Sequence, residues 1–191
     1  MLGILPNYRA GEESDPFTPL SVRRKFYIGY KDSTDYPIFF LAAGLAGLAQ
    51  LTNQHDEFGG GVKGYSQRLG GSVADQLIGN FMTESIMPVL LHEDPRYFRR
   101  GHGGIWSRTG YAASRVFIAR NDHGKTTFNF AEVSGNAIGA AVGNAYYPGE
   151  RRLSDNFGRF YSQMATDAFS QILKEFWPDI KNKYFHGKPK P

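Results

Sequence analysis

Residues 36–55, YPIFFLAAGLAGLAQLTNQH, contain no Lys, Arg, Asp or Glu, and they are strongly apolar from Pro37 to Leu51. Asp35 followed by Pro37 is typical of a helix start, since proline is tolerated in the first turn. A helix that spans a bilayer needs about 20 predominantly apolar residues. We therefore expect a helix here, either buried in a core or interface or forming a short membrane segment, and both interpretations stay open.

Small residues line one face of this expected helix, where AGLAG at 43–47 permits close approach of another helix. A second uncharged stretch, VSGNAIGAAVGNAYYPG at 133–149, carries three glycines at four-residue spacing. Glycine costs about 1 kcal/mol relative to alanine inside a helix, so three in register indicate a close contact, in a membrane or in a glycine-lined groove of a soluble bundle. The predicted packing positions are Gly44, Gly47, Gly135, Gly139 and Gly143.

Three further segments have helical periodicity. A long helix is expected over residues 66–92, and a helix with one basic edge over 108–118. The last helix is expected over 154–177, where apolar residues recur every three or four positions, and Pro178 is expected to end it. Together these segments predict an all-α fold, a single-domain bundle of about five helices, two of them glycine-rich and nearly uncharged.

The length of 191 residues suits one domain, since domains usually run to about 100–200 residues. Residues 1–20 combine prolines with polar and acidic positions and are expected to form an extended arm. Residues 21–182 would form the helical domain, and 183–191 a basic flexible tail. The first residues, MLGILP, lack the basic and apolar regions of a signal peptide.

The composition excludes some chemistry and favours one class of partner. The chain has no Cys, which excludes disulfides, thiolate zinc sites, iron–sulfur clusters and a cysteine nucleophile. Its formal charge of +4 favours anionic partners such as phospholipid head groups or nucleic acid. The aromatic fraction of 15% and the 23 glycines exceed what a small soluble enzyme needs.

Polar residues recur at four-residue spacing on three of the expected helices. Each row lies along one helix face, because four residues advance a helix by about 400°. In water such rows are solvated faces, which is the expectation for the last helix. In an apolar bundle they would form an interior network of amides and carboxylates, and for the first two helices both interpretations stay open. The rows are Ser72, Gln76, Asn80 and Glu84; Glu132, Asn136 and Asn144; and Gln163, Asp167, Gln171 and Glu175.

Residues 90–104, LLHEDPRYFRRGHGG, form either a site or merely the end of a helix. Pro95 disfavours a helical Asp94, and the simpler interpretation is a structural turn in which Arg96 pairs with a neighbouring carboxylate. The functional interpretation is an interfacial anchor, because amphipathic aromatics sit at the lipid head-group level and arginines bind phosphate. The predicted binding residues are Arg96, Tyr97, Phe98, Arg99 and Arg100.

An enzyme is the alternative hypothesis. His92 would act as general base, Asp94 or Glu84 would orient it, and Arg96 would hold an anionic group. A metal held by the first three side chains is a variant of this idea, but the sequence has no Glu-x-x-His or His-Glu-x-x-His motif. It also lacks a Gly-x-Ser-x-Gly elbow and nucleotide-binding loops. We therefore expect no metal and no cofactor.

Short motifs follow one another along nearly the whole chain: Ile4-Leu5-Pro6-Asn7-Tyr8-Arg9, Lys31-Asp32-Ser33, Gly64-Tyr65 with Arg68, Asp75 with Gly79-Asn80, Leu91-His92-Glu93-Asp94-Pro95-Arg96-Tyr97, Arg108 with Gly110-Tyr111-Ala112, Phe128-Asn129, Tyr146-Tyr147-Pro148 and Glu175-Phe176-Trp177-Pro178-Asp179-Ile180. Their order resembles a family of uncharacterised exported proteins of soil bacteria, chiefly Acidobacteria. Family members carry a signal peptide ahead of the Ile-Leu-Pro string, which this chain lacks. The resemblance implies an envelope location and supplies no reaction.

The sequence thus favours a non-enzymatic, membrane-associated structural or interaction protein of the bacterial cell envelope, in the periplasm or at the membrane. Its expected partners are membrane lipids or an envelope protein, and a homo-oligomer is left open. RNA binding through the Arg/aromatic segment would leave the apolar helices unexplained, so nucleic acid is not an expected partner.

Overall fold

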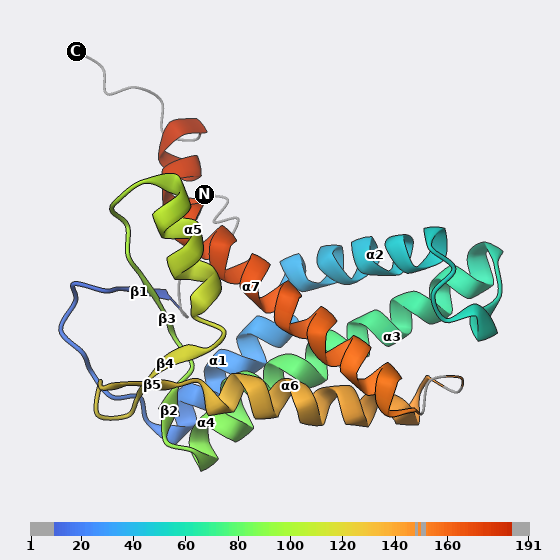
Figure 1. The fold of residues 1–191 in the computed structure, drawn as a ribbon, viewed down its shortest axis with the longest axis horizontal. Coiled ribbons are helices and arrows are strands. Elements are labelled where there is room, and N and C mark those ends of the chain that lie inside the picture. Colours follow the sequence, from blue (N-terminus) through green and yellow to red (C-terminus); the bar gives the residue numbers. More distant parts are fainter. Residues whose placement is uncertain (1–9, 148, 150–151, 185–191) are drawn as a thin grey trace.

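The computed structural model describes residues 10–147, 149 and 152–184, and Figure 1 shows a mainly helical chain with two small sheets. The prediction of a mainly helical fold is confirmed. The helices are α1 (Val22–Thr34), α2 (Tyr36–Leu51), α3 (Gly61–Phe81), α4 (Met87–Leu90), α5 (Ile105–Ser114), α6 (Phe130–Val142) and α7 (Leu153–Tyr184), with 3₁₀ turns η1 (Asp56–Phe58) and η3 (Gly143–Ala145).

Polar side chains fix where three of these helices begin. The Ser21 hydroxyl accepts a hydrogen bond from the Arg24 amide at α1, and Asp35 accepts one from the Tyr36 amide at α2. The Asn129 side chain accepts one from the Glu132 amide at α6. Such caps satisfy amides that have no partner inside the helix.

The helix expected over 66–92 is present as a nearly continuous rod. It runs through α3, a π-helical turn η2 (Met82–Ile86) and α4. Figure 1 shows α2 and α3 as an antiparallel hairpin that projects to the right, with α7 crossing its base. The π turn buries Thr83, Glu84 and Ser85, and it lies against α1 and α6.

The prediction of an all-α fold is confirmed only in part, because the segment that follows α4 forms short strands that pair with other strands of the chain. Strand β1 (Ala10–Glu12) pairs in parallel with β3 (Tyr97–Arg99), and β2 (Glu93–Asp94), β4 (Ile118–Asn121) and β5 (Thr126–Phe128) form an antiparallel sheet. These strands are two to four residues long, too short for an alternating pattern to be recognised. Residues 121–124 form the turn that joins β4 to β5.

The ends of the chain are described only in part. Strand β1 and the hydrogen bond from the Glu13 amide to the Arg99 carbonyl attach the predicted arm to β3. Residues 1–9 of that arm and residues 185–191 of the predicted tail lie outside the described residues. The division into arm, helical domain and tail stays a prediction.

Helix α7 continues through Pro178 to Tyr184, so the prediction that Pro178 ends this helix is wrong. An interior proline removes one backbone donor and crowds the preceding turn, at a cost of about 3 kcal/mol. Asp179 follows immediately and forms ion pairs with Arg99 at 2.9 Å and Arg108 at 2.6 Å. These contacts help to hold the turn after the proline in place.

Candidate functional site

The interior of the helical part is polar rather than purely apolar. Members of all three predicted polar rows are buried in it: Glu84, Glu132, Asn136, Gln163, Gln171 and Glu175. The Asn136 amide donates to Asp167 at 2.8 Å and so links α6 to α7. The prediction of a solvated row on the last helix is wrong, because α7 turns this face toward α6 and α5.

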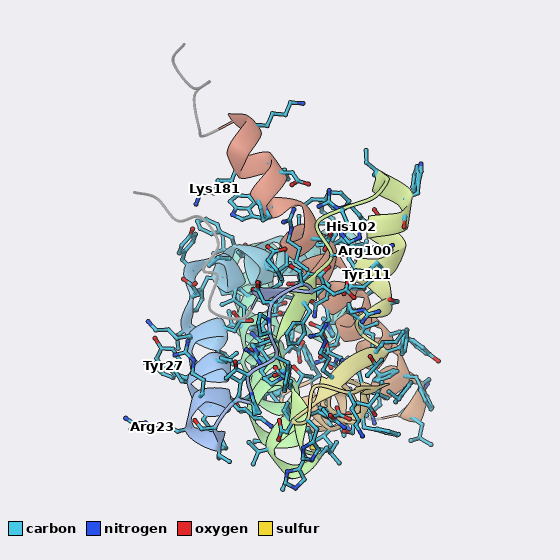
Figure 2. The ribbon with its side chains drawn as sticks, turned by 90° about the vertical axis from the view of Figure 1, so that its left-hand side faces the viewer. Arg23, Tyr27, Arg100, His102, Tyr111 and Lys181 are labelled. Carbon is cyan, nitrogen blue, oxygen red and sulfur yellow. The ribbon has the colours of Figure 1, made fainter. Side chains whose placement is uncertain are left out.

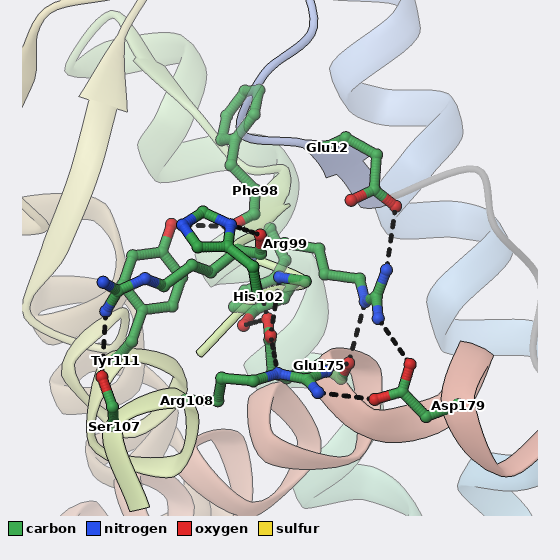
Figure 3. Close-up of polar contacts among 12 residues, drawn as sticks. Glu12, Phe98, Arg99, His102, Ser107, Arg108, Tyr111, Glu175 and Asp179 are labelled. Carbon is green, nitrogen blue, oxygen red and sulfur yellow. Dashed lines mark hydrogen bonds and ion pairs between the residues drawn. The ribbon is translucent and has the colours of Figure 1, made fainter. Parts of the chain in front are cut away.

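Glu175 lies at the centre of a buried cluster that ties α7 to the segment after β3 (Figure 3). One carboxylate oxygen accepts from the Tyr97 hydroxyl at 2.7 Å and the Arg100 amide at 3.0 Å. The other accepts from the Gly101 amide at 2.9 Å and Arg108 Nε at 2.8 Å. Burial alone would raise the pKa of Glu175, but the hydrogen bonds from these groups outweigh it and hold the pKa below its ordinary value.

The predicted binding residues are largely used inside this structure. Arg96 forms an ion pair with Asp94 at 2.6 Å, and Arg99 donates to the Glu175 carbonyl and to Asp179. Tyr97 and Phe98 are buried. Arg100 donates to the Ser107 hydroxyl and lies over the Tyr111 ring. The segment is the structural turn of the simpler interpretation, so it does not present a free cationic aromatic patch.

The predicted catalytic residues are not brought together. The His92 side chain is 83% exposed, and its Nδ1 lies 3.8 Å from Asp122. The Asp94 carboxylate is held by Arg96, and Glu84 is buried in the π turn beside Gly29 of α1. In the part of the chain that the structure describes, no group of three or more His, Asp or Glu residues could hold a metal ion.

The predicted packing glycines fall into two groups. A Cβ atom added at Gly135 would lie 2.9 Å from Thr83 Cγ2, and one at Gly143 would lie 2.9 Å from Arg159 Nε. Gly139 lies beside the Gln163 amide and Gly79 at ordinary contact distance. Gly44 and Gly47 have no described atom within 4 Å of an added Cβ, so they do not mediate a close helix contact within the described chain.

This difference predicts opposite effects of one substitution at two glycines. Gly135→Ala is expected to lower the free energy of unfolding by about 1–3 kcal/mol, because its Cβ would meet the backbone of η2. Gly44→Ala is expected to raise it by up to about 1 kcal/mol, because alanine favours the helix and meets nothing. Urea unfolding of both variants measures the two changes, and equal changes would contradict the assigned packing.

Helix α1 is inverted relative to an ordinary surface helix. It buries Lys25, whose ammonium donates to the Pro88 carbonyl at 3.0 Å and to Asp122 at 2.8 Å. Its outer side carries Val22, Phe26, Tyr27 and Tyr30, which we call the α1 aromatic face. Figure 2 shows Arg23 and Tyr27 at one edge of the molecule, with Arg100 and Tyr111 on the opposite side.

Helix α2 has the same inversion. Its inner side consists mostly of small residues, with Ala42, Ala46 and Ala49 buried. Its outer side carries large ones, with Phe40 76% and Leu51 87% exposed. Tyr36, Phe39, Phe40, Leu48 and Leu51 form what we call the α2 apolar face. Only Asp35 separates α1, which carries the α1 aromatic face, from α2.

Sequence reasoning did not find the α1 aromatic face. Its signal is present, because Val22, Phe26 and Tyr30 recur every four residues. Such a stripe is ordinarily assigned to a core, and the partner that draws Lys25 inward instead, Asp122, lies 97 residues later in the chain.

No protein-family model, curated protein or solved structure matches this chain. Among the described residues, no helix combines the length and the apolar character that crossing a membrane requires.

Proposed function

We propose that this chain is a non-enzymatic, membrane-associated structural or interaction protein of the bacterial cell envelope, and that it lies on an anionic membrane surface through the α1 aromatic face and the α2 apolar face. The observation that carries this proposal is the inversion of both helices. Each helix buries one large apolar residue, Ile28 or Ile38, and its other buried residues are lysine, glycine, serine or alanine, whereas phenylalanine, tyrosine and leucine are exposed. Small residues inside and large apolar residues outside are typical of helices whose surroundings are lipid.

The charges beside the α1 aromatic face suit lipid head groups. Arg23, Arg24 and Lys31 are exposed on the same helix, and the Arg24 guanidinium lies 4.9 Å from the centre of the Tyr27 ring. Basic side chains near an anionic membrane contribute about 1 kcal/mol each. Tyrosine suits this depth because its ring is apolar and its hydroxyl is hydrated. A peripheral position also agrees with a chain in which no described helix could cross a bilayer.

The non-enzymatic part of the proposal is supported by how the reactive side chains are used. Glu175, Asp94 and Arg108 are saturated by internal hydrogen bonds, and His92 faces solvent. The envelope location is supported by the resemblance of the motif order to exported proteins.

Substituting the two exposed rings of α2 tests the membrane contact. Phe39→Ser combined with Phe40→Ser is expected to weaken partition onto vesicles of phosphatidylglycerol and phosphatidylethanolamine by about thirtyfold, because each ring contributes about 1 kcal/mol when part of its surface leaves water. Cosedimentation at low and high salt measures the partition. The matched control is Phe117→Ser, since Phe117 is 50% exposed but lies outside both faces.

Other outcomes would overturn the proposal. A protein that is monomeric without detergent and does not bind the vesicles would contradict the proposed membrane contact. A dimer that the Phe39/Phe40 substitutions dissociate, again without vesicle binding, would make a second copy of the chain the occupant of the α2 apolar face. Equal losses for the Phe117 control would mean that the rings act through general hydrophobicity.

A further inference from the structure

A small cavity lies where strands β3 and β4 meet the helices α6 and α7. Its volume is about 30 Å³. No residue of the α1 aromatic face or the α2 apolar face lines it, and of the Glu175 cluster only Tyr97 does. We call it the arginine cavity, after the three arginines in its wall: Arg96, Arg115 and Arg120.

The guanidinium groups of Arg115 and Arg120 form no hydrogen bond or ion pair with the residues that the structure describes. The Arg115 guanidinium lies 4.2 Å from the centre of the Tyr111 ring, and its Nε is buried without a hydrogen-bond partner. The Arg120 guanidinium lies 4.1 Å from the centre of the Phe98 ring. Both arginines are only partly exposed. Arginine is seldom withdrawn from water unless an anionic group pairs with it, so both side chains are suited to an anionic partner.

The carboxylates of the cavity do not compensate all of its positive charge. Asp94 is held by Arg96, whose Nε and Nη2 donate to it at 2.6–3.1 Å, so this pair is neutral as a whole. Glu132 is the second carboxylate of the wall and is 4% exposed. Three arginines and two carboxylates leave one positive charge even when both carboxylates are ionised. The other polar side chains of the wall are uncharged: Thr83, Asn129 and Gln171.

Contacts with the rings of the wall place the three positive charges around this cavity. The Arg96 guanidinium lies 5.2 Å from the centre of the Phe98 ring, which Arg120 also contacts. Burial and Glu175 raise the pKa of Tyr97, whereas the charge of Arg115 acts in the opposite direction. Phe98 and Tyr97 both line the cavity. Because the wall is partly withdrawn from water, these charges attract an anion more strongly than exposed arginines do.

The volume of the cavity limits the size of its ligand. A water molecule needs about 10–15 Å³ of such space, so about 30 Å³ holds two water molecules or one small anion. Phosphate and sulfate are too large for it. The single uncompensated charge likewise matches a monovalent anion.

We propose that the arginine cavity binds one small monovalent anion, a halide such as chloride, with Arg115 and Arg120 as its ionic partners. The anion neutralises the charge that the carboxylates of the wall leave over. It also joins the end of α5 to β4, because Arg115 follows α5 and Arg120 belongs to β4. Since the cavity exists only in the folded chain, binding stabilises the fold.

Urea unfolding at constant ionic strength tests the proposal, with sodium chloride replacing sodium gluconate, whose anion is too large for the cavity. The unfolding midpoint is expected to rise with chloride and then to saturate. At ten times the dissociation constant, the unfolding equilibrium constant should be about elevenfold lower than in gluconate. Bromide is expected to act as chloride does, and sulfate is expected to show no saturable effect. Broadening of the chloride-35 resonance by the protein, reversed by bromide, would report the binding directly.

Substitutions of the arginines locate the site. Arg115→Gln and Arg120→Gln are each expected to weaken chloride binding at least about tenfold, because a charge-assisted contact is lost. Arg100→Gln is the matched control. Arg100 is also partly exposed and lies over the Tyr111 ring, at 5.7 Å, but it does not line the cavity. A variant that is less stable than wild type still reports, because the readout is its response to chloride.

A midpoint that rises without saturating, an equal response to sulfate, or equal losses of chloride binding for Arg100→Gln and Arg115→Gln would each overturn the proposal. Unfolding that does not respond to chloride would mean that the cavity holds water instead. The Phe39→Ser/Phe40→Ser variant separates this site from the membrane contact. It is expected to keep the chloride response of wild type, because neither ring lines the cavity.

Discussion

Glu175→Gln is expected to lower the free energy of unfolding by about 3–5 kcal/mol, the usual loss when one partner of a buried ion pair is removed. The Glu175 carboxylate is fully buried and accepts four hydrogen bonds, one of them from Arg108. Glutamine keeps the shape of the side chain but turns an NH₂ group toward a donor. Arg108 would then keep Asp179 as its remaining carboxylate partner, and Asp179 is 45% exposed. Urea unfolding at neutral pH measures the loss.

Glu12→Gln is the matched control for this prediction. Glu12 also pairs with an arginine of the segment, Arg99, but its carboxylate is 47% exposed and the distance is 3.4 Å. Exposed ion pairs contribute about 0–1 kcal/mol, so the control should change stability little. A loss at Glu175 no larger than that at Glu12 would show that the cluster does not hold α7 to the β3 segment.

The pH dependence gives the Glu175 cluster a second signature. The folded-state pKa of Glu175 lies below its ordinary value, so its contribution to stability is fully present above the unfolded pKa of about 4.3 and is lost as the pH falls through the lower folded pKa. The difference in stability between wild type and Glu175→Gln should therefore shrink in acid. A difference that stays constant down to that range would mean that the carboxylate charge is not what stabilises the cluster.

The helices could be predicted because their signals are local. Asp35 with Pro37 marks the start of α2, and the periodic apolar residues of α7 mark that helix as far as Trp177. The strands could not, because each is short and its partner is distant: Ala10 pairs with Tyr97, and Asp94 with Arg120. Pairing of this kind depends on which distant segments the tertiary fold brings together, and a local sequence pattern does not predict that.

The internal contacts of the predicted binding segment could not be foreseen, for a related reason. Arg99 and Tyr97 are residue types that suit lipid head groups. In the fold they donate hydrogen bonds to Glu175 and Asp179, which lie about 80 positions later in the chain. Both carboxylates come from α7, and Glu175 belongs to the polar row that was expected to face solvent. The burial of the row and the internal contacts of the Arg/aromatic segment therefore have the same cause, the packing of α7 against this segment.

Arg68→Met is expected to lower the free energy of unfolding by about 3 kcal/mol, because several buried acceptors would lose their donor together. Arg68 of α3 is 1% exposed and closes the tip of the α2–α3 hairpin. Its guanidinium donates to the carbonyls of Gln54, His55 and Gly59 and to the side chain of Gln50, at 2.7–2.8 Å. The tip also holds Asn53 and His55 at positive φ, a conformation that costs energy outside glycine and needs support from the surrounding structure.

Arg68→Lys should lose about half as much, since an ammonium keeps the charge but cannot reach acceptors arranged as a fork. Lys63→Met, at an exposed position of the same helix, is the control and should change stability by less than about 0.5 kcal/mol. Hydrogen exchange should be fastest in Arg68→Met at the amides of residues 52–59. Stability within 0.5 kcal/mol of wild type would mean that the tip closes without Arg68, and that α2 and α3 alone fix the hairpin.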